Sequence, residues 1–299
     1  ETTSEFFHAT VAKLLFLCKR GRPDTQTAIA FLCTRVQQPT KHDYNKLSRV
    51  VKYLRKTKDL VLRLSADNLN VVKWWVDASY AVHKDMRSHT GGTMSMGTGA
   101  AYSTSKKQKL NTKSSTEAEL VGVDDVLPQA LWTKYFLEAQ GYGTTALLHQ
   151  DNQSTIKLSE NGKASSRKGT RHIHIRYFFI TDRIARKEVA IQYCPTKKMV
   201  ADYFTKTLQG KLFYKFRDQI MGVAPMATIM GDHRSVLDVN PIVSEKPTIS
   251  DDLISARSEG AHDKRKTARK ADIHRSWADM VKLQPQNQAN AGLQPLNKR

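Results

Sequence analysis

Four acidic residues lie in sequence settings from which their carboxylates can converge. Asp77 and Asp151 each follow an apolar run typical of a buried strand, Glu119 lies on a predicted helix, and Asp202 lies near the start of a later helix. Carboxylates that are close together raise one another's pKa, so such a cluster is costly unless it binds a cation. Magnesium prefers oxygen ligands, and two such ions can activate a water and stabilise a leaving oxygen. The pattern is therefore typical of metal-dependent hydrolysis of phosphodiesters.

Three of these acids also have a purely structural interpretation. Asp77 could cap a turn, because Ala78 and Ser79 follow it. Asp151 and Asp202 could cap the helices that begin beside them. Taken one at a time, none of the three distinguishes a metal ligand from a cap.

Glu117 and Glu119 are alternatives for the helical acid. Glu119 shares a predicted helix face with Val123 and Val126, which should point to the core. Glu117 lies in the first turn, where an acid simply favours the positive end of the helix. We therefore choose Glu119.

Hydrophobic patterning predicts the elements that position these acids. Up to about residue 65 we expect helices, with Asp24 capping one of them, another helix over 43–56, and a terminal strand in which Leu60, Leu62 and Leu64 alternate. We then expect three antiparallel strands (71–80, 89–101, 101–105), a helix (114–140), a strand (145–150), two helices (152–159, 172–187), a strand (189–193) and a helix (200–220). This order predicts an α/β fold with a mixed sheet and flanking helices.

Composition divides the chain into three regions. We expect a small helical segment over 1–66 and an α/β domain over 67–222. The remainder, 223–299, is polar and slightly basic, a composition typical of a disordered tail.

The charge balance favours a nucleic-acid partner. The chain has 48 basic and 28 acidic residues, a formal net charge of +20, and such an excess attracts polyanions. Candidate contacts with a duplex are basic clusters that precede two predicted helices and polar side chains beside the acids. They are Lys106, Lys107, Lys109, Lys113, Arg167, Lys168, Arg171, Ser79, Asn152 and Gln153. The alternatives are solvated loops for the basic clusters and helix capping for Asn152.

Other features exclude competing classes. Cys18, Cys33 and Cys194 are far apart and odd in number, which favours reduced thiols in a reducing compartment. No segment resembles a signal peptide or is apolar for long enough to span a bilayer, so we expect no membrane association. The aromatic residues Trp74, Trp75, Trp132, Tyr135 and Phe136 are expected in the core.

Five segments together resemble the ribonuclease H domain of copia-type LTR retrotransposon polyproteins. They are VDASYAVHKDMRSHTGG, QKLNTKSSTEAELVG, HQDNQSTIKL, RHIHIRYFF and PTKKMVADYFTK. The resemblance covers about residues 5 to 222, and the helical segment resembles the part that joins reverse transcriptase to ribonuclease H. Beyond 222 the chain resembles nothing that we can name.

The resemblance implies a ribonuclease H-like five-stranded sheet and an endonuclease that cleaves the RNA strand of RNA:DNA hybrids. Asp77, Glu119, Asp151 and Asp202 are then the catalytic residues and hold two Mg²⁺ ions, with Mn²⁺ as a substitute. The implied partners are the hybrid and the reverse transcriptase part of the same polyprotein. The implied location is the cytoplasm, within a virus-like particle, or the nucleus.

The chain departs from the family pattern at two places. Cys194 to Ala201 contains no His, although many ribonucleases H have one in the loop before the last acid, and His174 stands where relatives commonly have Asp. Two other functions remain possible on the residues alone. One is an integrase-like nuclease that cuts DNA, and the other is a non-catalytic, nucleic-acid-binding relic of such an element.

Overall fold

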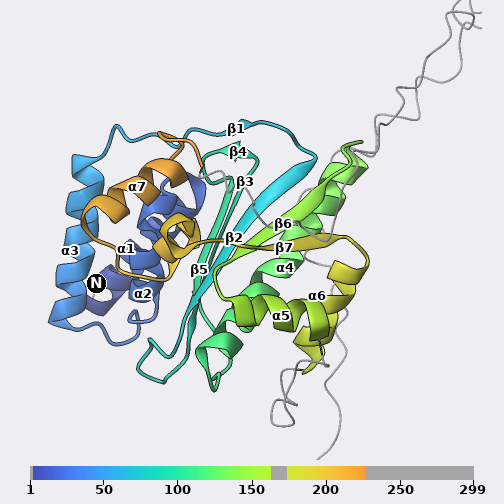
Figure 1. Ribbon diagram of the computed structural model, residues 1–299. Coiled ribbons are helices and arrows are strands. Elements are labelled where there is room, and N and C mark those ends of the chain that lie inside the picture. Colours follow the sequence, from blue (N-terminus) through green and yellow to red (C-terminus); the bar gives the residue numbers. More distant parts are fainter. Residues whose placement is uncertain (1–2, 163–173, 227–299) are drawn as a thin grey trace, which may run out of the picture. The chain divides into compact units, whose positions relative to one another are not determined.

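The computed structural model describes residues 3–162 and 174–226, and a five-stranded mixed sheet forms its centre (Figure 1). The strand order is β5-β3-β2-β6-β7, with β5, β3 and β2 antiparallel and β2, β6 and β7 parallel. The strands are β2 (Val71–Ser79), β3 (His89–Ser95), β5 (Tyr102–Lys107), β6 (Thr145–Gln150) and β7 (Val189–Tyr193). The predicted α/β fold, whose mixed sheet begins with three antiparallel strands, is confirmed.

Helices cover both faces of this sheet (Figure 1). One face carries α4 (Ser115–Ala139), α5 (Gln153–Asn161) and α6 (His174–Ala185). The other carries α1 (Thr3–Arg20), α2 (Gln26–Cys33), α3 (Lys41–Lys56), α7 (Gly210–Ile220) and the short 3₁₀ helix η5 (Val200–Phe204). Two further 3₁₀ helices are η1 (Pro23–Thr25) and η4 (Thr196–Lys198). None of the described helices is both long enough and apolar enough to cross a membrane.

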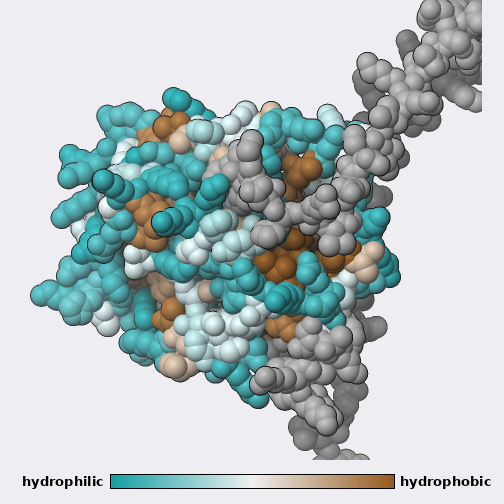
Figure 2. Space-filling view, in the orientation of Figure 1, coloured by the Kyte–Doolittle hydropathy of each residue, from teal (hydrophilic) through white to brown (hydrophobic). Residues whose placement is uncertain are grey.

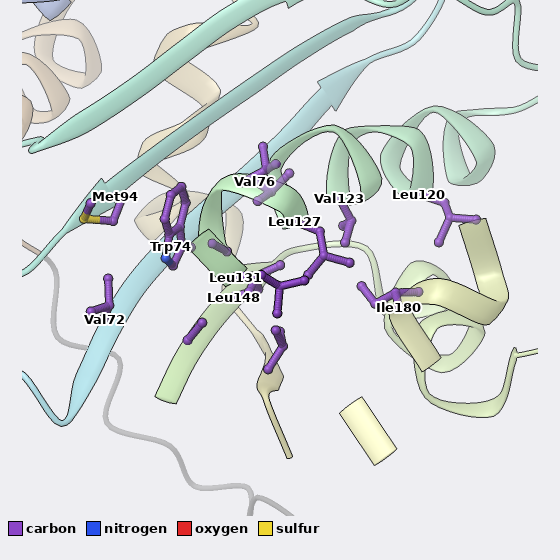
Figure 3. Close-up of a cluster of buried hydrophobic side chains, with 14 of the residues drawn as sticks. Val72, Trp74, Val76, Met94, Leu120, Val123, Leu127, Leu131, Leu148 and Ile180 are labelled. Atoms are coloured by element: carbon purple, nitrogen blue, oxygen red, sulfur yellow. The ribbon is translucent and has the colours of Figure 1, made fainter. Parts of the chain in front are cut away.

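A hydrophobic core lies on each face of the sheet, and β2 contributes side chains to both. It can do so because successive side chains of a strand point to opposite faces. Trp74 packs with α4 and β6 residues, a cluster that Figure 3 shows around Val76, Leu127 and Leu148. Trp75 packs on the other face, among residues of η5 and α7. Both tryptophans are fully buried, as expected. Asp77 has the same parity as Trp75 and therefore points to the face that η5 covers.

The helical segment has its own core and packs on the sheet. Phe7, Ile29 and Leu47 are buried among α1, α2 and α3. Polar contacts tie α2 to β5 and to η5, since Gln26 donates to the Ser103 carbonyl at 3.2 Å and Thr27 donates to the Tyr203 carbonyl at 2.6 Å. The limits that we predict at residues 66 and 222 stay predictions.

Two elements of the helical segment differ from prediction. Asp24 does not cap α2, because its carboxylate accepts hydrogen bonds from Arg22 (2.8 and 2.9 Å) and Tyr53 (2.7 Å) instead. Leu60 to Leu64 form no strand, because their backbone finds no strand edge and Arg63 donates to the carbonyl of Met221. The strand here, β1 (Ser65–Ala66), pairs with β4 (Gly97–Thr98).

The last predicted helix is also wrong as one continuous element. The chain forms η5, leaves helical geometry after Phe204, and begins α7 only at Gly210. Contacts with β2 interrupt it, since the Thr205 side chain donates to Asp77 and the Thr205 carbonyl accepts from Ser79 at 3.3 Å. Asp202 therefore lies in a tight 3₁₀ turn held against the sheet.

Three aromatic residues of α4 were expected in the core and are exposed. Trp132 and Phe136 are 60% and 50% exposed, and their rings stack at 5.3 Å on the side of α4 away from the sheet. Tyr135 is 43% exposed beside them. The prediction was wrong because aromatic type alone does not say which face of a long helix meets the sheet.

The surface is mainly polar, in keeping with the charge balance. Figure 2 shows one face of the molecule, on which hydrophilic residues dominate and hydrophobic residues form separate patches. All three cysteines are free, with Cys18 and Cys194 buried and Cys33 half-buried, in agreement with the expectation of reduced thiols.

Candidate metal centre

Three of the four predicted acids meet at one edge of the sheet. Asp77 lies near the end of β2, Asp151 directly follows β6, and Asp202 lies in η5. One carboxylate oxygen from each lies within 4.8 Å of the other two. Asp77 and Asp202 are buried and Asp151 is half-buried. Oxygen ligands at this spacing fit a hard divalent cation such as Mg²⁺ or Mn²⁺.

The register of the parallel strands explains why Asp77 and Asp151 are neighbours. Strands β2 and β6 pair Trp75 with His149, and extending that register by two residues puts Asp151 beside Asp77. The His149 ring stacks on Trp75 at 4.8 Å and holds the two strand ends together. Both carboxylates therefore lie at the carboxyl ends of adjacent parallel strands, where α/β folds bind ligands.

Glu119 reaches the same site from α4. It is buried, and one carboxylate oxygen accepts a hydrogen bond from Gln150 at 3.2 Å. Gln150 ends β6, next to Asp151, so it orients Glu119 toward the aspartates. Glu119 lies outside the tight group of three oxygens but close enough for Asp77 and Asp151 to act on its charge.

The structure separates Glu119 from the alternative, Glu117. Glu117 accepts a hydrogen bond from the backbone of Lys113 at 2.7 Å, and its own backbone donates to the Ser114 side chain at 3.2 Å. This reciprocal pattern is a helix cap. Glu117 therefore stabilises the start of α4, and Glu119 is the helical acid that faces the aspartates.

The capping interpretation also fails for the aspartates. Asn152 caps α5, accepting from the backbone of Ser154 at 3.0 Å and of Thr155 at 3.2 Å. Asp151 instead accepts from the Thr196 side chain at 3.3 Å. No side chain caps η5, and the hydrogen bonds to the Asp77 carboxylate come from Thr205 and Lys206.

Two glycines of β3 allow the acids to come together. Gly91 is paired with Asp77, and a β-carbon on Gly91 would lie 2.5 Å from a Thr205 methyl, 2.9 Å from the Phe204 β-carbon and 3.0 Å from the Ala201 carbonyl. On the opposite face, a β-carbon on Gly92 would lie 2.8 Å from Val126 of α4. The pair lets η5 approach one face and α4 the other, which brings Asp202 and Glu119 to the strand ends.

Like charges and burial disfavour ionisation of the cluster. Burial, with the charge of Asp77, raises the pKa of Asp202 to about 7. Burial and then Asp77 also raise the pKa of Asp151. The pKa of Glu119 lies well above its usual range, mainly through burial and secondly through Asp77 and Asp151. The carboxylates repel one another when they are ionised, and a bound divalent cation would reduce that repulsion.

We expect Asp202→Asn to remove a pH dependence of stability in EDTA. Because the pKa of Asp202 is raised to about 7 from 3.8, the folded state retains a proton between about pH 4 and 7 that the unfolded chain releases. The free energy of unfolding of the wild type should therefore fall, relative to Asp202→Asn, by roughly 1–3 kcal/mol as the pH rises across that window. Denaturant unfolding of both proteins at several pH values measures this, and parallel pH profiles would contradict it.

The sequence interpretation missed one charged group at this site. The Lys206 ammonium lies 2.8 Å from an oxygen of Asp202 and 3.5 Å from an oxygen of Asp77. Burial lowers the pKa of Lys206, but the charges of Asp77 and Asp202 outweigh that effect and the pKa is raised. The sequence did contain a signal for this contact. Lys206 follows Asp202 by four residues, a spacing at which side chains of a helical turn are neighbours.

Three of the residues predicted to contact nucleic acid lie beside the acids. Asn152 and Gln153 line an open hollow of about 410 Å³ together with Asp77, Glu119, Asp151 and Lys206. Ser79 is half-buried and donates to Thr205, next to the acids.

Of the two basic clusters predicted to contact a duplex, the structure describes the first, which runs from Lys106 to Lys113. Lys106 pairs with Asp125 at 3.4 Å and Lys107 with Asp85 at 2.6 Å, while Lys109 and Lys113 are exposed. Arg167, Lys168 and Arg171 lie outside the described residues.

The chain is similar to polyproteins of plant transposons. It is 28% identical over 209 residues to the retrovirus-related Pol polyprotein from transposon TNT 1-94 of Nicotiana tabacum, a match that covers 69% of the chain and 16% of the polyprotein. It is 29% identical over 202 residues to the Pol polyprotein from transposon RE1 of Arabidopsis thaliana, covering 67% and 14%. The chain thus spans about a sixth of these relatives or less, and the predicted relationship to retrotransposon Pol polyproteins is confirmed.

Similarities to solved structures are weak. The RNase H1 isolated from compost, LC11-RNase H1, has 11% identity and a TM-score of 0.34, covering 45% of this chain and 92% of that one. The protease-reverse transcriptase of prototype foamy virus has 14% identity and a TM-score of 0.29, covering 44% and 18%. The fold assignment therefore rests on the order and register of the strands. No family model matches the chain.

Proposed function

We propose that this relative of transposon Pol polyproteins is a metal-dependent nuclease that cleaves the RNA strand of RNA:DNA hybrids. The observation that carries the proposal is the meeting of Asp77, Asp151 and Asp202, with oxygens within 4.8 Å, beside a buried Glu119. Such a cluster of buried carboxylates is costly without a cation, and its cost is explained by a catalytic metal site.

The four carboxylates fit a pair of Mg²⁺ or Mn²⁺ ions. Their donors are all oxygens, and no His or Cys joins the group among the described residues, which favours hard cations over zinc. When bound, two such ions supply an activated water and stabilise the leaving oxygen. Asp77 would be the carboxylate shared by both ions, since one of its oxygens lies within 4.8 Å of an oxygen of Asp151 and of an oxygen of Asp202.

The protein's own groups orient these ligands. Gln150 donates to Glu119, Thr196 to Asp151 and Thr205 to Asp77, so each of the three carboxylates has at least one side-chain donor that limits its rotation. Outer donors of this kind commonly fix the geometry of metal ligands. The buried Trp75 and Phe204 behind the site give it an apolar, rigid floor.

We further propose that the hybrid lies across the open hollow. Asn152 and Gln153 border that hollow and can donate to the backbone of the cleaved strand. The exposed Lys109 and Lys113, with Lys106 and Lys107, suit phosphate contacts along the duplex. Discrimination of RNA from DNA would rest on 2′-hydroxyls in the wide minor groove. We propose the reverse transcriptase part of the same polyprotein as partner, and the cytoplasm or nucleus as location.

The purified chain should cleave an RNA:DNA hybrid in Mg²⁺, leaving 3′-hydroxyl and 5′-phosphate ends, and should lose that activity in EDTA. An end-labelled hybrid, an RNA duplex and a DNA duplex of the same sequence serve as parallel substrates. Cleavage of the DNA duplex would favour an integrase-like nuclease. Binding of the hybrid without cleavage in either Mg²⁺ or Mn²⁺ would favour a non-catalytic relic.

A matched pair of variants identifies the active residues in the same assay. Glu119→Gln removes a charge from the cluster and should abolish cleavage. Glu117→Gln removes the same charge two residues away but retains an oxygen that can accept from Lys113, so it should retain cleavage. Equal activity of the two variants would contradict the assignment.

A further inference from the structure

Within the described part of the chain, Lys206 is the basic residue that contacts the carboxylates of the candidate metal centre. Its ammonium contacts Asp202 at 2.8 Å and Asp77 at 3.5 Å, and its charge acts on Asp151 and Glu119 as well. The side chains of Asp77 and Asp202 are 2% and 5% exposed, whereas that of Lys206 is 40% exposed. A partly exposed ammonium therefore partly neutralises a group of buried acids.

The local chain geometry brings this ammonium to the site. Lys206 follows Asp202 by four residues, and its backbone donates to the Asp202 carbonyl at 2.9 Å. The preceding Thr205 is anchored to β2 through Asp77 and Ser79. These contacts hold the Lys206 backbone in place. A displacement of the ammonium would therefore come from rotation of the side chain.

An ammonium and divalent ions cannot share these oxygens. A metal ligated by Asp77 and Asp202 would bring its charge within a few ångströms of the Lys206 ammonium, where repulsion between cations is strong. The Lys206 side chain has somewhere to go, because it also borders a second hollow, of about 540 Å³, next to Thr207, Leu208 and Phe213.

We propose that Lys206 is the built-in counter-ion of the metal-free site, and that binding of divalent ions displaces its ammonium from Asp77 and Asp202. This inference rests on the proposed metal-dependent function and adds a residue to it. In the metal-free protein Lys206 holds the acids together, and it competes with the metal for the same oxygens. It thereby sets the metal concentration at which the site fills.

Lys206→Gln tests the competition directly, with Mn²⁺ as the probe. At pH 8, titration calorimetry should show Mn²⁺ binding about tenfold or more tighter in Lys206→Gln than in the wild type, since no ion pair has to be broken. In EDTA the same variant should unfold at a lower temperature, because the acids lose their partner. Lys211→Gln, which removes an exposed lysine of α7, is the matched control and should change neither quantity.

A second measurement uses the wild type and avoids any folding defect. Acylation of Lys206 by an amine-reactive reagent, followed by mass spectrometry, should speed up several-fold when Mg²⁺ replaces EDTA, because the amine leaves the acids. Acylation of Lys211 should not change. An unchanged rate at Lys206, or Mn²⁺ affinity in Lys206→Gln no higher than in the wild type, would overturn the displacement.

The two proposals fail in different ways. If the wild type binds Mn²⁺ and cleaves the hybrid while Lys206→Gln binds Mn²⁺ no more tightly, only the role of Lys206 is wrong. If the wild type binds no divalent ion, the metal centre itself is wrong, and the counter-ion role falls with it.

Discussion

Asp77→Asn should lower the rate of hybrid cleavage in Mg²⁺ by about 10³-fold or more, which corresponds to a loss of about 4 kcal/mol of transition-state stabilisation. The charge of Asp77 helps to raise the pKa of Asp151, Asp202 and Glu119, so all three carboxylates respond to it. An asparagine keeps the size of the side chain and an oxygen that can accept from Thr205. It lacks the negative charge that Asp77 would contribute to a divalent cation under the proposed function.

Stability separates this loss from unfolding. Removing one charge from a set of crowded carboxylates relieves repulsion, so the melting temperature of Asp77→Asn in EDTA should not fall far below that of the wild type. Asp67→Asn is the matched control, because Asp67 is exposed and pairs only at the surface with Lys73. A normal rate of hybrid cleavage by Asp77→Asn in Mg²⁺ would refute the assignment of the site.

Gly91→Ala should reduce hybrid cleavage by about a hundredfold, although residue 91 supplies no chemistry. The added methyl would lie 2.5 Å from a Thr205 methyl and 3.0 Å from the Ala201 carbonyl, so η5 must move away from β3. That movement shifts Asp202 and loosens the Thr205 hydrogen bond to Asp77. Overpacking of this kind costs roughly 1–3 kcal/mol of folding stability.

Gly143→Ala is the matched control for this substitution, because nothing lies within 4 Å of the position where its β-carbon would be. Cleavage rates are measured at a temperature at which circular dichroism shows both variants folded, across a range of Mg²⁺ concentrations. Because Asp202 would be displaced, we expect Gly91→Ala to need more Mg²⁺ than the wild type for half-maximal cleavage. An unchanged Mg²⁺ requirement and rate would show that the contact of η5 with β3 does not position Asp202.

The order of the strands along the chain, and the acids near their ends, were predictable from local patterns. Apolar runs before Asp77 and Asp151 mark buried strands, so both acids were expected near strand ends, and Asp151 directly follows β6 while Asp77 lies two residues before the end of β2. Glu119 could be preferred over Glu117 because helical periodicity relates it to Val123 and Val126, which are buried. These signals depend only on neighbours in the chain.

Other features were not predictable because they depend on contacts between distant segments. The helix expected over 200–220 has good local propensity, but hydrogen bonds from Thr205 and Ser79 hold the chain out of helical geometry. Trp132 and Phe136 satisfy a helical pattern whether they face the sheet or the solvent. A local pattern gives the period of a helix, whereas its packing partner decides which face is covered.

The mixed α/β sheet, and the placing of the acids near the ends of strands and on a helix, follow from the amino-acid pattern alone, because strand and helix periodicity act over a few residues. Only the tertiary structure decided that Lys206 contacts Asp77 and Asp202, that Gly91 is a close-approach site, and that Gln150 orients Glu119. Each of these contacts joins residues brought together by strand register or by the folding of η5 onto β3. The physical reason is that a side chain's partners are set by the path of the whole chain, which no single segment encodes.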